Sequence, residues 1–282
     1  MFSKVAIIGT GNVGTWLFQT LHNNKVEVAA ISSRKIETLP PNFDLYIFAV
    51  KDDVYEDVLK KITFRMPHAV HTSGSLSQNI LAPYADNFGV IYPYQSITKA
   101  ENTLNPYLLI APLVAEKEKR RKGEKEKRRK GEEEKGEISY GLTLLRSYGL
   151  IPVCIEASTT TFEDILYHWT NTMFDNVHKV SEKQRFAMHL AAVFANNFTN
   201  AMYGIAYDIF KENSIDWSLI FPLLENTLEK VKHQNPKECQ TGPAKRGDIS
   251  IMEKHCNALH NNDLKELYNL ISEIISKFSL NL

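Results

Sequence analysis

The chain has 282 residues, of which 43% are hydrophobic, and its 33 basic side chains balance 33 acidic ones. This length suits two domains with a sizeable core, and the zero net charge excludes a general attraction to nucleic acid. Three scattered cysteines without CxxC spacing favour free thiols in a reducing compartment over a disulfide framework or a metal site: Cys154, Cys239 and Cys256.

The first predicted element is the strand "KVAIIG", Lys4 to Gly9, which leaves no room for a signal peptide before it. No apolar run of the sequence is long enough to span a membrane. We therefore expect a cytoplasmic protein without membrane contact.

A glycine-rich turn follows this strand and opens a helix over residues 12–24. In its GxGxxG motif, Gly9 permits a tight turn, Gly11 lets the backbone approach a pyrophosphate, and Gly14 allows the helix to pack closely on the strand. The unpaired amides of the helix N-terminus favour anions. The motif predicts a dinucleotide site, and a turn packed for its own sake is the alternative. The predicted site comprises Gly9, Thr10, Gly11, Asn12, Val13 and Gly14.

The second predicted strand, residues 26–31, ends in "SSR". An acidic residue there would accept hydrogen bonds from the ribose hydroxyls and repel a 2′-phosphate. Ser32, Ser33 and Arg34 instead offer hydroxyl donors and a guanidinium, which favours NADP over NAD. Alternatively, Arg34 is only a solvated surface charge.

Three further strands are predicted over residues 45–50, 69–73 and 88–93. Because a doubly wound sheet places its ligand crevice at the carboxyl edge, we expect Ala49, Val50 and Lys51 to border the cofactor. Ser73 and Ser75, in "HTSGS", are candidates for binding a substrate carboxylate or the nicotinamide carboxamide. A turn capped by these hydroxyls is the alternative.

The segment from Glu116 to Glu137 contains a perfect eight-residue repeat, and 19 of its 22 residues are charged. Such a segment cannot bury a core. It carries 11 Lys or Arg against 8 Glu, a net charge of +3, and the interleaved glutamates favour a solvated insertion over a nucleic-acid-binding arm. A recent sequence expansion without function is a third interpretation.

The alternation of strands and helices predicts an α/β fold with a Rossmann-type doubly wound parallel sheet, whose last strand covers residues 149–157. We expect this dinucleotide-binding domain over residues 1–157, with the charged insertion at about 100–148. An all-α domain, for substrate binding or dimerisation, is expected over residues 158–282.

One helix of the second domain is predicted over residues 182–213 and has the apolar pattern of a buried helix. At about 100° per residue, His189, Asn196 and Asn200 fall within a stripe about 40° wide. Since a buried amide without a partner costs roughly 1 to 3 kcal/mol, the stripe predicts either a polar network or a ligand. A helix this long usually needs a partner surface, which favours a homodimer.

The loop "QTGPAKRGD" precedes a later helix. Its Arg246 can clamp a carboxylate with two hydrogen bonds, and Asp248 can cap the helix or orient Arg246. A loop that pins two helices, or a dimer contact, is an equally good interpretation.

Five motifs together resemble a group of NADP oxidoreductase-like proteins that join a Rossmann domain to a helical domain of unknown function: "VAIIGTGNVG", "FAVKDD", "HTSGSL", "HLAAVFANNFTN" and "QTGPAKRGD". More distantly, the chain is similar to pyrroline-5-carboxylate reductases, prephenate dehydrogenases and the 6-phosphogluconate and β-hydroxyacid dehydrogenases. In β-hydroxyacid dehydrogenases, a helix of the second domain presents a catalytic lysine. This chain has His189 nearest to that place, and histidine suits proton transfer near neutral pH. A satisfied core or interface histidine is the alternative.

The residues and the resemblance favour an NADPH-dependent oxidoreductase that transfers a hydride between the cofactor and a small carbonyl, imine or hydroxy-acid substrate carrying a carboxylate. The candidate catalytic residues are His189, Asn196, Asn200, Ser73, Ser75 and Arg246. The rival is a non-catalytic NADP-binding sensor or scaffold that dimerises through its helical domain, and the missing lysine supports it.

Overall fold

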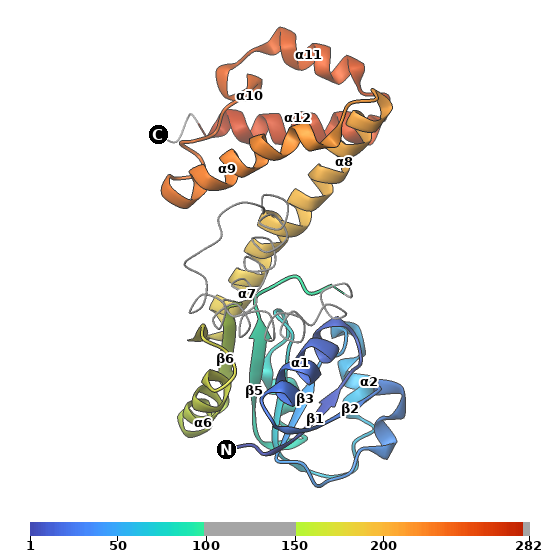
Figure 1. Cartoon of the computed structure of the whole chain (residues 1–282), viewed down its shortest axis with the longest axis vertical. Coiled ribbons are helices and arrows are strands. Elements are labelled where there is room, and N and C mark those ends of the chain that lie inside the picture. The colour runs from blue at the N-terminus through green and yellow to red at the C-terminus, as the bar shows by residue number, and fades with distance from the viewer. Residues whose placement is uncertain (99–150, 279–282) are drawn as a thin grey trace, which may run out of the picture. The chain divides into compact units, whose positions relative to one another are not determined.

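The computed structural model describes residues 1–98 and 151–278 and divides the chain into two compact units (Figure 1). Unit 1 is Met1–Phe198 and unit 2 is Thr199–Leu282. The charged repeat from Glu116 to Glu137, with the insertion predicted around it, lies outside the described residues.

Within its described residues, unit 1 is built on a seven-stranded sheet with the order β2-β1-β3-β4-β5-β6-β7. The first five strands are parallel to one another. The chain steps from β2 back across β1 to β3, which makes β1 the point where the strand order reverses. The strands are β1 (Lys4–Ile8), β2 (Glu27–Ile31), β3 (Leu45–Phe48), β4 (Met66–His71), β5 (Ala85–Pro93), β6 (Val153–Ala157) and β7 (Val177–Lys179).

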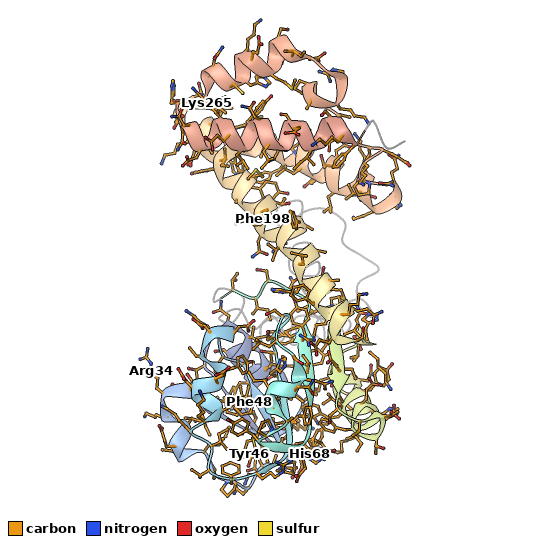
Figure 2. All side chains as sticks on the ribbon, turned by 180° about the vertical axis from the view of Figure 1, so that it is seen from behind. Arg34, Tyr46, Phe48, His68, Phe198 and Lys265 are labelled. Carbon is orange, nitrogen blue, oxygen red and sulfur yellow. The ribbon has the colours of Figure 1, made fainter. Side chains whose placement is uncertain are left out.

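An apolar cluster covers each face of the sheet. Successive residues of a strand point to opposite sides, so each strand contributes side chains to both clusters. On β1, Val5 and Ile7 join one apolar cluster, which also contains Trp16 of helix α1 (Asn12–Asn23) and side chains of α6 (Thr160–Asn171). Ala6 and Ile8 join the opposite cluster, which includes side chains of helix α2 (Tyr55–Leu59) and of β3. Two side chains of this second cluster are labelled in Figure 2, Tyr46 and Phe48. The predicted doubly wound α/β fold is confirmed.

The sheet differs from the prediction at β6, which runs antiparallel to β5. A parallel pair needs a crossover connection, usually a helix, and the alternation of strands and helices on which the prediction rests stops at the charged insertion. The two strands approach closely at Gly89, where an added Cβ would lie 2.2 Å from the carbonyl oxygen of Glu156.

Unit 1 extends past residue 157, where the sequence analysis ends the first domain. The buried side chains of α6, Phe162, Leu166 and Trp169, pack on the sheet, and β7 adds a strand inside the region expected to be all-α. A strand of three residues is too short to leave an alternation pattern in the sequence. Helix α7 (Glu182–Ala192) also belongs to unit 1.

The long helix predicted over residues 182–213 is present as a helical run with an interruption. After α7, the segment Val193–Phe198 is a π-helix, and α8 covers Thr199–Glu212. The predicted stripe of polar residues assumes an uninterrupted α-helix, so its spacing argument does not hold across this segment. The expectation of a buried helix is also wrong for the single chain, because Phe186, Leu190 and Phe194 are 51%, 50% and 63% exposed.

Unit 2 is helical but has no closed core, since none of its described residues is buried. Among the residues described, no helix is long and apolar enough to cross a membrane. After α8, its helices are the 3₁₀ turn η5 (Trp217–Ile220), α9 (Phe221–His233), the short α10 (Pro243–Arg246), α11 (Ile249–Ala258) and α12 (Asn262–Lys277).

Candidate cofactor and active site

The carboxyl ends of four neighbouring strands lie in register at one edge of the sheet. Ile8 of β1 pairs with Phe48 of β3, Phe48 pairs with His71 of β4, and His71 pairs with Val90 of β5. The segments that follow these strands therefore meet at the edge where a doubly wound sheet places its ligands.

The glycine turn after β1 has the geometry that its three glycines predict. Gly9 has a φ of +119°, and an added Cβ would lie 2.2 Å from the carbonyl oxygen of Ala49. A Cβ on Gly14 would lie 2.0 Å from the carbonyl oxygen of Gly9, so α1 can approach the strand only with glycine here. A Cβ on Gly11 would meet nothing within 4 Å, and Gly11 is the N-cap of α1 without a side-chain cap. No described atom therefore blocks the approach of a phosphate to Gly11, beside the uncapped amides of α1.

The remaining residues of this turn have separate roles. Asn12 donates a hydrogen bond from Nδ2 to the carbonyl oxygen of Ile97 at 3.0 Å, which ties the turn to the segment after β5. Val13 packs partly buried against the core, and Thr10 is exposed. The first turn of α1 contains no acidic residue, so no carboxylate there opposes a bound phosphate.

The segment after β2 presents an exposed cation, Arg34. The Ser32 hydroxyl accepts a hydrogen bond from the Arg34 amide at 3.4 Å, and Ser33 begins the 3₁₀ turn η1 (Ser33–Thr38). The Arg34 side chain is exposed, extends away from the ribbon in Figure 2, and has no ion pair with the described residues. These groups fit a 2′-phosphate, whereas the carboxylate that NAD sites place at this position is absent.

The segment after β3 passes directly beside the glycine turn. The Ala49 amide donates to the carbonyl oxygen of Ile8 at 2.8 Å, and Val50 lies 3.3 Å from the position of an added Gly9 Cβ. Lys51 is exposed and precedes the 3₁₀ turn η2 (Asp52–Val54). Ala49 and Val50 are thus beside the predicted cofactor turn, and a role in binding remains a prediction.

The turn after β4 is organised around one carboxylate that the sequence analysis did not single out. Asp52 accepts hydrogen bonds from the Ser73 hydroxyl at 2.9 Å and from the Ser75 hydroxyl. The Ser73 oxygen also accepts from the amides of Ser75 and Leu76, at 3.1 and 3.0 Å. Ser73 is buried and its hydrogen bonds hold the turn together, whereas Ser75 is only partly buried.

A buried arginine fixes this turn to α7. Arg185 has no exposed surface, and its guanidinium donates to the carbonyl oxygens of Ser73 at 3.0 Å and Leu76 at 2.8 Å. It also pairs with the buried carboxylate of Glu156 at 3.1 Å. Burial raises the pKa of Glu156, and the charge and hydrogen bond of Arg185 act in the opposite direction. At the start of α7, Glu182 accepts from the Ser77 hydroxyl at 2.7 Å.

One turn after Arg185, α7 brings His189 against the same loop. Gly74 makes this approach feasible, because an added Cβ would lie 2.6 Å from Nδ1 of His189 and 2.9 Å from Cζ of Tyr92. The Tyr92 hydroxyl lies 3.0 Å from Nδ1 of His189. Burial raises the pKa of Tyr92 to about 12, so its hydroxyl stays protonated at neutral pH. The tautomer of the imidazole decides which of the two groups donates in this hydrogen bond.

Behind the turn, His71 is fully buried and neutral. Its Nδ1 accepts a hydrogen bond from the Ser73 amide at 3.2 Å, while its Nε2 has no partner among the described residues. Burial is the main cause that lowers its pKa from 6.5 to about 4, and the positive charge of Arg185 acts in the same direction. His71 therefore supports the turn without carrying a charge.

The other predicted catalytic residues are not part of this cluster in unit 1. Asn196 is exposed and lies in the π-helical segment Val193–Phe198. Asn200 and Arg246 belong to unit 2. Arg246 pairs with Asp248, with Nε 2.8 Å and Nη2 2.7 Å from Oδ2, and Asp248 makes no side-chain cap, so Asp248 orients the arginine.

Sequence reasoning missed four polar residues around the turn: Asp52, Tyr92, Arg185 and His71. Asp52, Tyr92 and His71 follow strands or lie at the ends of strands whose carboxyl ends were already predicted to share an edge, which is a usable signal. Arg185 stands four residues before His189, which places it on the same helix face. The burial of His71 had no signal, since it depends on packing from both sides.

Comparisons with known proteins agree with the fold. The model of a domain of unknown function, DUF2520, matches residues 151–275. Among solved structures, the chain is similar to BF3122 of Bacteroides fragilis, assigned as an NADP oxidoreductase, with 26% identity over 97% of both chains and a TM-score of 0.74. No curated protein matches the chain.

Two further structures share the fold at lower identity. A 1-pyrroline-5-carboxylate reductase from Streptococcus pyogenes has 12% identity and a TM-score of 0.51, covering 97% of this chain and 98% of its own. An imine reductase from Myxococcus stipitatus in complex with NADP⁺ has 10% identity and a TM-score of 0.54, covering 97% of this chain and 92% of its own. The resemblance to NADP oxidoreductase-like proteins, and more distantly to pyrroline-5-carboxylate reductases, is confirmed.

Proposed function

We propose that the chain is an NADPH-dependent oxidoreductase that transfers a hydride between the cofactor and a small carbonyl, imine or hydroxy-acid substrate. The observation that carries this proposal is the contact of His189 with Gly74, at the same sheet edge as the glycine turn. A group suited to proton transfer thus lies in the unit that contains the predicted cofactor turn. The similarity to BF3122, assigned as an NADP oxidoreductase, supports the proposal.

The cofactor would be held by backbone amides and by one guanidinium. The open space at Gly11 and the uncapped amides of α1 suit the pyrophosphate, and Arg34 suits the 2′-phosphate. Ala49 and Val50, packed beside Gly9, would limit how deeply the cofactor sits. When bound, NADPH would supply the hydride.

The chain's own contribution to the reaction is proton transfer and orientation. When a hydride adds to a carbonyl or imine carbon, the π electrons move to the oxygen or nitrogen, which then takes a proton. In its protonated form, His189 would give this proton from Nε2 and become a neutral imidazole, and Tyr92 would hold the ring through Nδ1. The roles of Asn196, Asn200 and Arg246 remain predictions from the sequence.

We also propose that the protein is a homodimer formed through its helices. Unit 2 has no buried residue among those described, and a helical unit without a core needs another surface to bury its apolar side chains. Leu219, Leu223 and Ile249 are 67%, 62% and 65% exposed. A second copy of the chain would cover these side chains.

The deciding experiment is a fluorescence titration of the purified protein with NADPH and NADH, repeated on Arg34→Ala. We expect tight NADPH binding that weakens about tenfold or more in the variant, because one charge-assisted contact to a phosphate is lost, while NADH binding is unchanged. Lys35→Ala, an exposed neighbour in η1, is the matched control. Absence of binding by either nucleotide would rule out the proposal. Binding without turnover of any carbonyl or imine would favour the sensor instead.

A further inference from the structure

We propose that Asp52 and Ser75 form a subsite for a protonated nitrogen of the substrate, and that a substrate carboxylate is excluded from this turn. The inference rests on the proposed function, because it names the substrate class of the same site. It reverses the sequence-based expectation that Ser73 and Ser75 hold a carboxylate.

The hydroxyl protons of the turn are already engaged in hydrogen bonds. The hydroxyls of Ser73 and Ser75 both donate to Oδ2 of Asp52. A carboxylate ligand needs hydrogen-bond donors, and here both hydroxyls already donate to a carboxylate of the protein. An arriving anion would have to displace Asp52 from both serines.

Hydrogen bonds within the turn leave only some of its oxygen atoms to a ligand. The Ser73 oxygen is saturated, since it accepts from the amides of Ser75 and Leu76 while donating to Asp52. Oδ1 of Asp52 accepts no hydrogen bond from the described residues, and the Ser75 oxygen keeps a lone pair. The side-chain atoms of the turn that remain available are therefore acceptors, and they fit a ligand that donates.

The local charge at the turn comes from the carboxylate of Asp52. Asp52 is exposed, and it forms no ion pair within the described part of the chain. Arg185, the buried cation behind the turn, donates its hydrogen bonds to Glu156 and to the carbonyl oxygens of Ser73 and Leu76. The turn thus presents a carboxylate without a cationic partner, which attracts an ammonium or iminium group and repels an anion.

The subsite adjoins the contact between Gly74 and His189. Ser75 is the neighbour of Gly74, and Gly74 lies against His189 and Tyr92. A nitrogen held by Asp52 and Ser75 would lie at the turn that His189 contacts. His189 is the residue that is proposed to transfer the proton. The structure therefore favours amines and imines over keto acids as the substrate class.

The test compares two probes of the same size and opposite charge, n-butylammonium and butyrate. Their binding to the full-length protein is followed by saturation-transfer NMR, with and without NADP⁺. We expect the ammonium to bind more tightly than butyrate, and Asp52→Asn to weaken it about tenfold or more, because a charge-assisted hydrogen bond is lost. Asp53→Asn, the exposed neighbour in η2, is the matched control and should leave the ammonium affinity unchanged.

A second variant guards against a loosened turn. Ser75→Ala keeps Asp52 and its bond to Ser73, and we expect a smaller loss of ammonium affinity, about threefold. Tighter binding of butyrate, or equal ammonium binding by wild type and Asp52→Asn, would overturn the inference. Equal weakening of NADP⁺ and ammonium binding would also overturn it, because Asp52 would then bind the nicotinamide carboxamide. Failure of the proposed function is seen separately, as absence of NADPH binding while ammonium binding is intact.

Discussion

The Tyr92 hydroxyl lies 3.0 Å from Nδ1 of His189, and the two rings meet edge to face with centroids 6.0 Å apart. Tyr92 is the penultimate residue of β5 and His189 lies on α7, so the pair joins the sheet edge to the helix. The hydrogen bond between the Tyr92 hydroxyl and Nδ1 orients the imidazole ring and leaves Nε2 without a partner among the described residues. The ring is thereby positioned for proton transfer through Nε2.

The first prediction is that Tyr92→Phe lowers turnover about tenfold, the effect of losing one orienting hydrogen bond. His189→Ala removes the proton donor itself and should lower turnover by roughly 10²- to 10⁴-fold. Both variants should bind NADPH as the wild type does. Tyr94→Phe is the control, since its ring lies 6.1 Å from that of Tyr92 and its hydroxyl has no hydrogen bond in the described structure. Equal turnover in Tyr92→Phe and wild type would contradict the orienting role.

The second prediction concerns the contact at Gly74. Gly74→Ala should destabilise the protein by roughly 1–3 kcal/mol, because the new Cβ would lie 2.6 Å from Nδ1 of His189 and must displace the ring. Turnover should fall further than in Tyr92→Phe. Gly204→Ala is the control, because its Cβ would meet nothing within 4 Å and α8 should gain about 0.5–1 kcal/mol. Urea unfolding of the two variants should move in opposite directions.

The third prediction tests the buried ion pair that fixes the turn. Arg185→Met leaves the carboxylate of Glu156 buried without its cation, and we expect a loss of roughly 3–5 kcal/mol in the free energy of unfolding. The double variant Arg185→Met/Glu156→Leu should recover part of this loss, because no charge is then left buried. Recovery stays incomplete, since the carbonyl oxygens of Ser73 and Leu76 lose their donors. Lys60→Met, which breaks an exposed ion pair, should cost far less.

Much of the fold could be predicted from local patterns. The strands follow from short apolar runs, and the glycine turn from spacing that serves both packing and phosphate approach, as Gly9 and Gly14 show. The antiparallel β6 could not be predicted, because its direction depends on a connection without a recognisable pattern. The π-helical segment was equally hidden, since its residues have ordinary helix-forming character.

Part of the candidate site could be predicted from the sequence, but its internal hydrogen bonds could not. Ser73 and Ser75 were predicted to bind a ligand, with a turn capped by their hydroxyls as the alternative, and in the structure both hydroxyls donate to Asp52. Spacing along a strand places side chains at an edge, yet it does not say which of them satisfy one another. Competition between a ligand and a neighbouring carboxylate is decided by tertiary geometry, which one sequence does not contain.

The fourth prediction is an acid-dependent loss of stability caused by His71. In the folded protein its pKa is lowered to about 4, whereas the unfolded chain binds the proton near the ordinary value of 6.5. The contribution to stability is therefore intact above pH 6.5 and is lost as the pH falls from about 6.5 to about 4, a change of roughly 3 kcal/mol. In the variant His71→Asn, the asparagine side chain keeps an acceptor for the Ser73 amide and does not titrate. Urea unfolding of His71→Asn should lack this component, and parallel pH profiles for both proteins would contradict the assignment.

The last prediction addresses the dimer proposed from the exposed apolar side chains of unit 2. Leu223, on α9, is 62% exposed, and a second copy that covers it should bury a leucine, a gain of roughly 1.5–3 kcal/mol per site. Leu223→Arg would place a charge in that contact, so the variant should sediment as a monomer at concentrations where the wild type is a dimer. Its unfolding midpoint should fall and no longer depend on protein concentration. Lys254→Glu, an exposed change on α11, is the control and should leave the sedimentation unchanged. A wild-type protein that sediments as a monomer at all concentrations would refute the dimer.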